Sequence, residues 1–136
     1  MPRVLIIDDD ADMVEALKIV LEKKGYSVDF AYEGEAGYNK AAAERPDLII
    51  LDVMMKTKDQ GFQISYKLKG NPELSRIPII MLTAVGKETG YRFSHADEDY
   101  LPADEFVEKP VKPAYLLKLA GELIRKSGRE SGTSRI

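Results

Sequence analysis

The sequence predicts an α/β domain, a doubly wound sheet of five parallel strands with helices on both faces. Two observations support this prediction. Short apolar runs alternate along the chain with longer segments in which apolar residues recur at helical spacing, as in consecutive strand–helix units. The apolar runs are also continuous and rich in branched residues, which is typical of parallel strands buried on both faces. With 136 residues, the chain has the length of one domain.

Five strands are predicted from these runs. Residues 4–7, 48–51 and 77–82 are continuous apolar segments, as expected of strands that are covered on both faces. Residues 27–31 alternate only weakly and suit a strand near an edge, and residues 106–107 form a short fifth strand.

Helices are predicted between the strands, where apolar residues recur three and four positions apart. The first is capped by Asp10 or Asp12 and ends at Gly25. Residues 85–103 are the hardest to interpret, because two glycines interrupt any helical pattern there. The predicted helices are residues 11–24, 34–44, 61–69 and 113–126.

The last ten residues, SGRESGTSRI, are rich in Gly and Ser and are predicted to be disordered. The predicted organisation is therefore one domain over residues 1–126 and a tail over residues 127–136. Because so few residues follow the last predicted helix, no DNA-binding output domain is expected.

Composition excludes several classes of site. The chain has no Cys and a single His, His95, which excludes disulfides, thiolate zinc sites and multi-histidine metal sites. Its formal net charge of −3 argues against non-specific nucleic-acid binding. No apolar run approaches the roughly 18 residues of a membrane span, and the N-terminus does not form a signal peptide. We therefore expect a cytoplasmic protein with no direct nucleic-acid contact and no membrane insertion.

Reactive polar residues lie at or just beyond the ends of four of the five predicted strands. In a parallel sheet the carboxyl ends of the strands meet at one edge, where ligands bind. We therefore expect these residues to gather there, although they are far apart in sequence. They are Asp8, Asp9 and Asp10 after the first strand, Asp52 after the third, Thr83 after the fourth and Lys109 after the fifth.

Such a group of residues suits phosphoryl transfer. Carboxylates placed together repel one another unless a cation lies among them. An all-oxygen ligand set favours a hard ion, best Mg²⁺, with Mn²⁺ as the alternative. A lysine and a hydroxyl suit the remaining oxygens of a phosphoryl group. Asp52 is the expected nucleophile, because it stands alone at the end of a buried strand. Taken singly, each residue also has an ordinary structural explanation, such as helix capping by the acidic turn.

Four short motifs carry a resemblance to a known family. They are IIDD at residues 6–9, LDVMM at 51–55, MLTA at 81–84 and VEKP at 107–110. The sequence resembles a CheY-like receiver domain of the response regulators of two-component signal transduction, and the likeness covers roughly residues 3–126. One motif alone is weak evidence, but four in the family's order and nearly its spacing are strong evidence.

The resemblance implies a role for each matching residue. Asp52 matches the aspartate that accepts a phosphoryl group from the phosphohistidine of a partner kinase. Asp8 and Asp9 match the acidic pair that binds Mg²⁺, together with Asp52 and the backbone carbonyl of Met54. Thr83 matches the switch hydroxyl that hydrogen-bonds a phosphoryl oxygen.

Two residues near the end of the likeness are also implied to have roles. Lys109 matches the lysine that pairs with the phosphoryl group, and its peptide bond to Pro110 is implied to be cis. Phe106 matches the aromatic switch position, where the ring moves inward on activation. The implied fold has the flavodoxin-like strand order 2-1-3-4-5.

Two segments depart from the family's pattern. In the loop after Asp52, Lys56 stands where the family usually has proline, and the loop is one residue longer. Lys56 and Lys58 lie close in sequence to the acceptor and are expected to alter phosphoryl lifetime or partner choice. Residues 85–105 are about four residues longer than the family's usual fourth helix with its connections, so an unusual output partner is expected.

The function implied by the resemblance is a phosphorylation-dependent signalling switch. The chain is expected to receive its phosphoryl group from a histidine kinase or phosphotransfer protein. It then presents a changed face to a downstream protein, as a monomer or a phosphorylation-linked dimer. It is not expected to be an enzyme, apart from its own phosphorylation and dephosphorylation.

Two alternatives stay open. An aspartyl phosphatase of the haloacid dehalogenase type would use Asp8 as its nucleophile, and a receiver-like scaffold would work without phosphate. The identity of the phosphorylated aspartate, Asp8 or Asp52, distinguishes the phosphatase from the switch.

Overall fold

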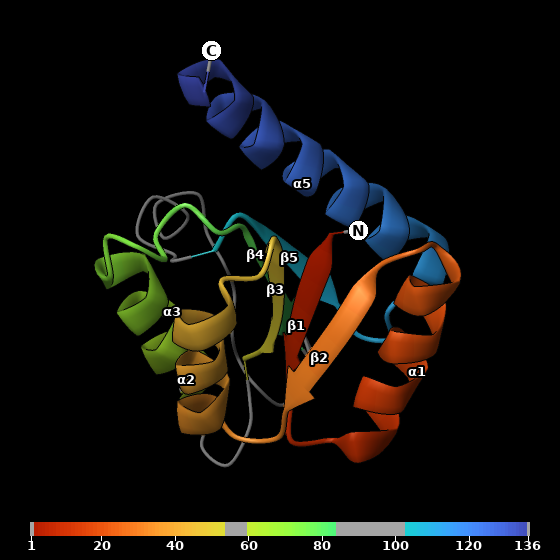
Figure 1. Ribbon diagram of the computed structural model, residues 1–136. Helices are drawn as coiled ribbons and strands as arrows, with labels where there is room; N and C mark the ends of the chain where they lie inside the picture. Colours follow the sequence, from red (N-terminus) through yellow and green to blue (C-terminus); the bar gives the residue numbers. More distant parts are fainter. Residues whose placement is uncertain (1, 54–59, 84–102, 136) are drawn as a thin grey trace.

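The computed structural model describes residues 2–53, 60–83 and 103–135, with side chains described as far as residue 127. In this part of the chain, strands and helices alternate around a central sheet (Figure 1). The elements are β1 (Arg3–Ile7), α1 (Ala11–Lys23), β2 (Ser27–Ala31), α2 (Gly34–Glu44), β3 (Leu48–Asp52), α3 (Gln60–Gly70), β4 (Ile79–Thr83), β5 (Glu105–Glu108) and α5 (Pro113–Arg135).

All neighbouring strands in the sheet are parallel, and their order is β2-β1-β3-β4-β5. The predicted fold class and strand order are therefore confirmed. β2 lies at one edge, as its weak alternation predicted, and β5 lies at the other. The three continuous apolar runs form β1, β3 and β4 in the middle of the sheet, where both faces are covered by helices.

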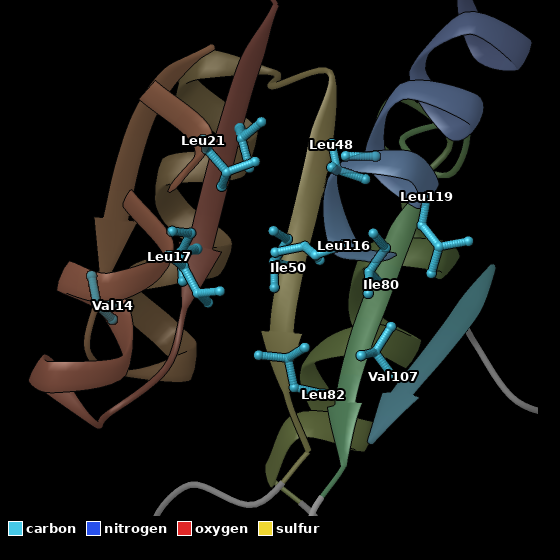
Figure 2. Packing of buried hydrophobic residues seen from close by; sticks show 13 residues of the cluster. Val14, Leu17, Leu21, Leu48, Ile50, Ile80, Leu82, Val107, Leu116 and Leu119 are labelled. Carbon is cyan, nitrogen blue, oxygen red and sulfur yellow. The ribbon is translucent and has the colours of Figure 1, made fainter. Parts of the chain in front are cut away.

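The two faces of the sheet carry separate hydrophobic cores, because successive side chains of a strand point to opposite faces. On one face, alternate strand residues such as Ile6, Ile50 and Ile80 pack against α1 and α5. Figure 2 shows Leu17 and Leu21 of α1 and Leu116 and Leu119 of α5 among them. On the other face, the remaining strand residues pack against α2 and α3. This arrangement leaves the two ends of the sheet as the places where polar groups can gather.

The boundaries of two elements differ from the prediction by more than one residue. β4 begins at Ile79 rather than at residue 77, because the N–H of Ile77 donates to the carbonyl of Leu74 in a turn and Pro78 has no N–H for a ladder. α5 extends to Arg135, nine residues beyond the predicted end. The backbone of residues 127–135 is therefore helical where the Gly- and Ser-rich composition predicted disorder, since low helix propensity is only a weak guide to backbone geometry. The division of the chain at residue 126 stays a prediction.

A charged pair that sequence reasoning did not single out holds the beginning of β4 and β5. The ammonium group of Lys69, near the end of α3, donates to the carbonyls of Ser75 and Ile77 and to Oδ2 of Asp104. The same Asp104 oxygen accepts the backbone N–H of Ile79 at 2.8 Å. These contacts join the residues at the beginnings of β4 and β5.

Asp10 is the cap of α1, and it is expected to matter for stability. Its side chain accepts the backbone N–H groups of Asp12 and Met13 at 3.0 and 3.2 Å. Replacing an N-cap acid by alanine removes these bonds, so Asp10→Ala should lower the free energy of unfolding by about 1 kcal/mol. Urea unfolding measures this change. Asp12→Ala is the matched control and should lower it by no more than about half as much; equal losses would contradict the capping role.

Candidate functional site

The parallel register brings the ends of four strands together at one edge of the sheet. Asp52 lies beside Leu82 in the β3–β4 ladder, and the N–H of Val53 continues that ladder to the carbonyl of Leu82. The N–H of Lys109 likewise donates to the carbonyl of Thr83 at 2.8 Å. Backbone pairing therefore places residues from distant parts of the sequence at one edge, as the position of polar residues at strand ends predicted.

Three carboxylates form a compact acidic group at this edge. One oxygen from each of Asp8, Asp9 and Asp52 lies within 4.8 Å of the others, a spacing that suits a shared metal ion. Asp8 is fully buried and Asp52 is 4% exposed, whereas Asp9 is exposed. The group therefore has two buried acids, Asp8 and Asp52, and one acid, Asp9, that is exposed to solvent.

Lys109 is a cation that faces the buried acids. Its ammonium group donates to Oδ2 of Asp52 at 3.3 Å, and it lies 3.9 Å from Oδ2 of Asp8. The peptide bond from Lys109 to Pro110 is cis, as the resemblance implied. Among the described residues, the charge of Lys109 cannot balance three carboxylates, so this part of the site has an excess of negative charge that a divalent cation would offset.

The environment of Asp8 favours its protonated form in the absence of a metal. Oδ1 of Asp8 accepts the backbone N–H of Asp10 at 3.0 Å, whereas Oδ2 is buried without a hydrogen-bond partner among the described residues. Burial raises the pKa of Asp8 to about 7, and the neighbouring carboxylate of Asp52 adds to the increase. An unsatisfied buried oxygen next to two further carboxylates fits the donor set of a hard, oxygen-binding cation.

Thr83 supplies a hydroxyl at the end of β4. The side chain is 4% exposed, and its Oγ1 is buried without a hydrogen-bond partner among the described residues. A buried hydroxyl without a partner is uncommon. It is therefore available for an acceptor group that enters the site.

The other residues predicted for the site are placed less directly. Phe106 lies on β5 opposite Met81 and packs, partly buried, against the core that faces α2 and α3. Met54, the Lys56–Lys58 loop and most of the long 85–105 segment lie outside the described residues. Asp10 acts as the cap of α1 and is not a member of the acidic group.

Gly61 is a site neighbour that sequence reasoning treated only as the beginning of a helix. Its backbone N–H donates to the carbonyl of Val53 at 2.9 Å, so α3 begins directly against the end of β3. A glycine before an apolar helix pattern was a sequence signal for this contact, and so was its place at the end of the loop after Asp52, where the family usually has Asp-Gly.

Comparison with known proteins identifies the family. The model of the response regulator receiver domain matches residues 4–120. The chain belongs to this family. The receiver domain is 36% identical over 129 residues to the DNA-binding dual master transcriptional regulator RpaA of Synechocystis sp., covering 95% of the chain and 52% of the relative. It is 34% identical over 125 residues to the alkaline phosphatase synthesis transcriptional regulatory protein PhoP of Bacillus subtilis, covering 92% and 49%.

Solved structures agree with this assignment. The CheY-like receiver domain protein of Methanospirillum hungatei has a TM-score of 0.80 and 26% identity, with 96% of this chain and 98% of that chain covered. The signal receiver domain of a histidine kinase from Syntrophus aciditrophicus has a TM-score of 0.80 and 31% identity, with 93% of this chain and 92% of that chain covered.

Within the described residues, none of the helices has the length and apolar character that crossing a membrane requires.

The receiver domain spans about half the length of the curated relatives that it matches. Those relatives are named as transcriptional regulators, and RpaA as DNA-binding. The expectation that this chain has no DNA-binding output is therefore not confirmed and stays a prediction.

Proposed function

We propose that this receiver domain is a phosphorylation-dependent switch in which Asp52 accepts a phosphoryl group from the phosphohistidine of a histidine kinase or phosphotransfer protein. The observation that supports it best is the meeting of Asp52 with Asp8, Asp9 and Lys109 at one edge of the sheet. The family to which the chain belongs supports the same reaction.

Asp8, Asp9, Asp52 and the backbone carbonyl of Met54 are the proposed ligands of Mg²⁺, with Mn²⁺ as the alternative. The all-oxygen donor set and the unpartnered buried oxygen of Asp8 fit such an ion. When bound, the ion supplies positive charge that offsets the repulsion between the carboxylates and an incoming phosphoryl group.

The chemical step is a transfer of the phosphoryl group between two side chains. A carboxylate oxygen of Asp52 attacks phosphorus as the bond from phosphorus to the donor imidazole nitrogen breaks, and an aspartyl phosphate forms. Lys109, which pairs with Asp52 at 3.3 Å before the reaction, then pairs with a phosphoryl oxygen. The hydroxyl of Thr83 donates a hydrogen bond to another. Attack of water on phosphorus later returns Asp52 to its carboxylate form.

The signal passes to a downstream protein through Thr83 and Phe106. In the proposed switch, Thr83 moves toward the phosphoryl group and the ring of Phe106 turns inward, so the surface around β5 and α5 changes. The two residues lie on neighbouring strands, Thr83 beside Glu108 and Phe106 beside Met81, which supports their coupling. We place the protein in the cytoplasm, acting on another protein as a monomer or a phosphorylation-linked dimer and without direct nucleic-acid contact.

Mapping the phosphorylated residue tests this proposal. The protein is incubated with acetyl phosphate and Mg²⁺, the acyl phosphate is reduced with borohydride, and peptide mass spectrometry locates the resulting homoserine. We expect the label at residue 52, and its loss when EDTA replaces Mg²⁺. A label at residue 8 would instead support the haloacid dehalogenase type of phosphatase, and no label at any aspartate would support a phosphate-independent scaffold.

A further inference from the structure

Gly61 lies closer to the acceptor strand than any side chain would permit. A Cβ atom on Gly61 would lie 2.2 Å from the carbonyl oxygen of Asp52, 2.5 Å from Cα of Val53 and 2.6 Å from the carbonyl oxygen of Val53. All three atoms belong to the backbone, so no change of side-chain rotamer can relieve the overlap. The N–H of Gly61 also donates to the carbonyl of Val53 at 2.9 Å. The beginning of α3 thus lies directly against the backbone carbonyl groups of Asp52 and Val53 at the end of β3.

Other tightly packed glycines in the described part of the chain differ in this respect. A Cβ on Gly34 would come within 2.6 Å of the Ile64 side chain, and one on Gly37 within 2.6 Å of the Ile7 side chain. Those neighbours are side-chain atoms, not the backbone of the strand that carries Asp52. Gly70, at the other end of α3, has open space around it. Gly61 is therefore distinguished by the backbone of Asp52 and Val53 against which it lies.

We infer that Gly61 is a positioning residue for Asp52, because its lack of a side chain lets α3 hold the Asp52 backbone where the carboxylate meets Lys109 and the acidic group. This inference rests on the proposed function, since it assigns Gly61 a part in the same site. The Asp52 carboxylate is attached to the backbone that Gly61 contacts, and its Oδ2 lies 3.3 Å from the Lys109 ammonium group. The carbonyl of Val53 immediately precedes Met54, the proposed backbone ligand, so the same contact defines where that loop begins.

A methyl group at residue 61 forces either α3 or the end of β3 to move. An ordinary contact between a carbon and an oxygen needs roughly 3.2 Å or more, so a Cβ placed 2.2 Å from the Asp52 oxygen requires a displacement of about 1 Å. A displacement of this size in a reacting group typically lowers a rate by about 100-fold. The expected consequence is a poorly placed nucleophile in a chain that still has its fold.

The test compares Gly61→Ala with two matched variants, Gly34→Ala and Gly70→Ala, in the full chain. For each, urea unfolding gives the folded fraction, and the rate of Asp52 phosphorylation is measured at saturating acetyl phosphate and Mg²⁺. We expect Gly61→Ala to lower the maximal rate per folded molecule by about 10- to 100-fold. Gly70→Ala meets open space, so it should stay within about twofold of the unmodified protein. Gly34→Ala meets the Ile64 side chain of α3 and not the Asp52 backbone, so it should lower the rate less than Gly61→Ala does. A residue that only stabilises the fold would change the folded fraction and leave the rate per folded molecule unchanged.

Two further measurements keep the result decisive. If Gly61→Ala is unfolded in buffer, the rates of all variants are compared in trimethylamine N-oxide, which favours the compact state. If it remains unfolded there, replacing Gly61 by glycolic acid removes the N–H that donates to Val53 without adding an atom, and the maximal rate should fall by at least about threefold.

An unchanged maximal rate per folded molecule in the variant that folds would overturn the positioning role. Failure of the proposed function has a different signature, because the unmodified protein would then carry no phosphoryl group on Asp52. The inference about Gly61 fails alone if the unmodified protein is phosphorylated on Asp52 and the variant reacts equally fast.

Discussion

The Asp52→Asn variant is expected to take up no measurable phosphoryl group from acetyl phosphate and Mg²⁺, a loss of at least about 1000-fold in rate. An amide has nearly the shape of a carboxylate but lacks the anionic oxygen that attacks phosphorus. The side chain is 4% exposed and accepts a hydrogen bond from Lys109 at 3.3 Å, which the amide oxygen can still accept. The variant should therefore keep its fold while it loses the reaction.

Intact-mass spectrometry of the protein after incubation with the phosphodonor measures this loss. Asp12→Asn is the matched control, because Asp12 is an exposed acid in the first turn of α1 and is not a member of the acidic group. The control should be phosphorylated within about twofold of the unmodified rate. If Asp52→Asn gains the phosphoryl mass as fast as the control does, the nucleophile is another residue and the proposed mechanism fails.

Much of the fold could be predicted because buried parallel strands have a simple sequence pattern. The runs that became β1, β3 and β4 are apolar on both faces, and the structure buries alternate residues such as Leu5 and Ile6 in different cores. Boundaries were less predictable, since they depend on single hydrogen bonds. β4 begins after Pro78 because Ile77 is taken into a turn. The salt bridge between Lys69 and Asp104 joins residues 35 positions apart in the sequence. Local sequence patterns carry no information about contacts at that separation.

The residues of the candidate site could be predicted because topology brings strand ends together, but their environments could not. Asp8 and Asp9 are neighbours in sequence, yet the first is fully buried and the second is exposed. This difference depends on how the turn after β1 packs against β2 and β3. The role inferred for Gly61 was also hidden, because its close approach to Asp52 arises only when the chain returns to the end of β3.

The Asp8→Asn variant is expected to be more stable than the unmodified protein at neutral pH and to bind Mg²⁺ more weakly. Burial, together with the charge of Asp52, raises the pKa of Asp8 to about 7 in the folded state, whereas an unfolded chain has an ordinary Asp pKa near 3.9. Without metal, the folded state thus holds a proton that the unfolded state releases between about pH 4 and pH 7. The unfolding free energy that Asp8 contributes is therefore complete below pH 4 and is lost as pH rises toward and through 7.

Asparagine keeps the oxygen that accepts the Asp10 N–H at 3.0 Å and has no charge to bury, so the stability of Asp8→Asn should not decline over this range. In EDTA, the variant should exceed the unmodified protein by about 2–4 kcal/mol at pH 8 and by much less at pH 4. Urea unfolding at several pH values measures the difference. Asp9→Asn also removes a carboxylate but at an exposed position, so it should gain no comparable stability at pH 8.

Metal binding should show the opposite trend, because the proton on Asp8 must leave before its carboxylate can coordinate a cation. Mg²⁺ affinity of the unmodified protein is expected to rise with pH up to about pH 7, and Asp8→Asn should lower that affinity by about 10- to 100-fold at pH 8. Calorimetric titration with Mg²⁺ measures both effects. A variant that gains no stability at pH 8 and binds Mg²⁺ as tightly as the unmodified protein would mean that Asp8 neither carries the burial penalty nor holds the ion. Opposite changes in stability and affinity would instead indicate that the fold tolerates an unfavourable buried acid because the metal site needs it.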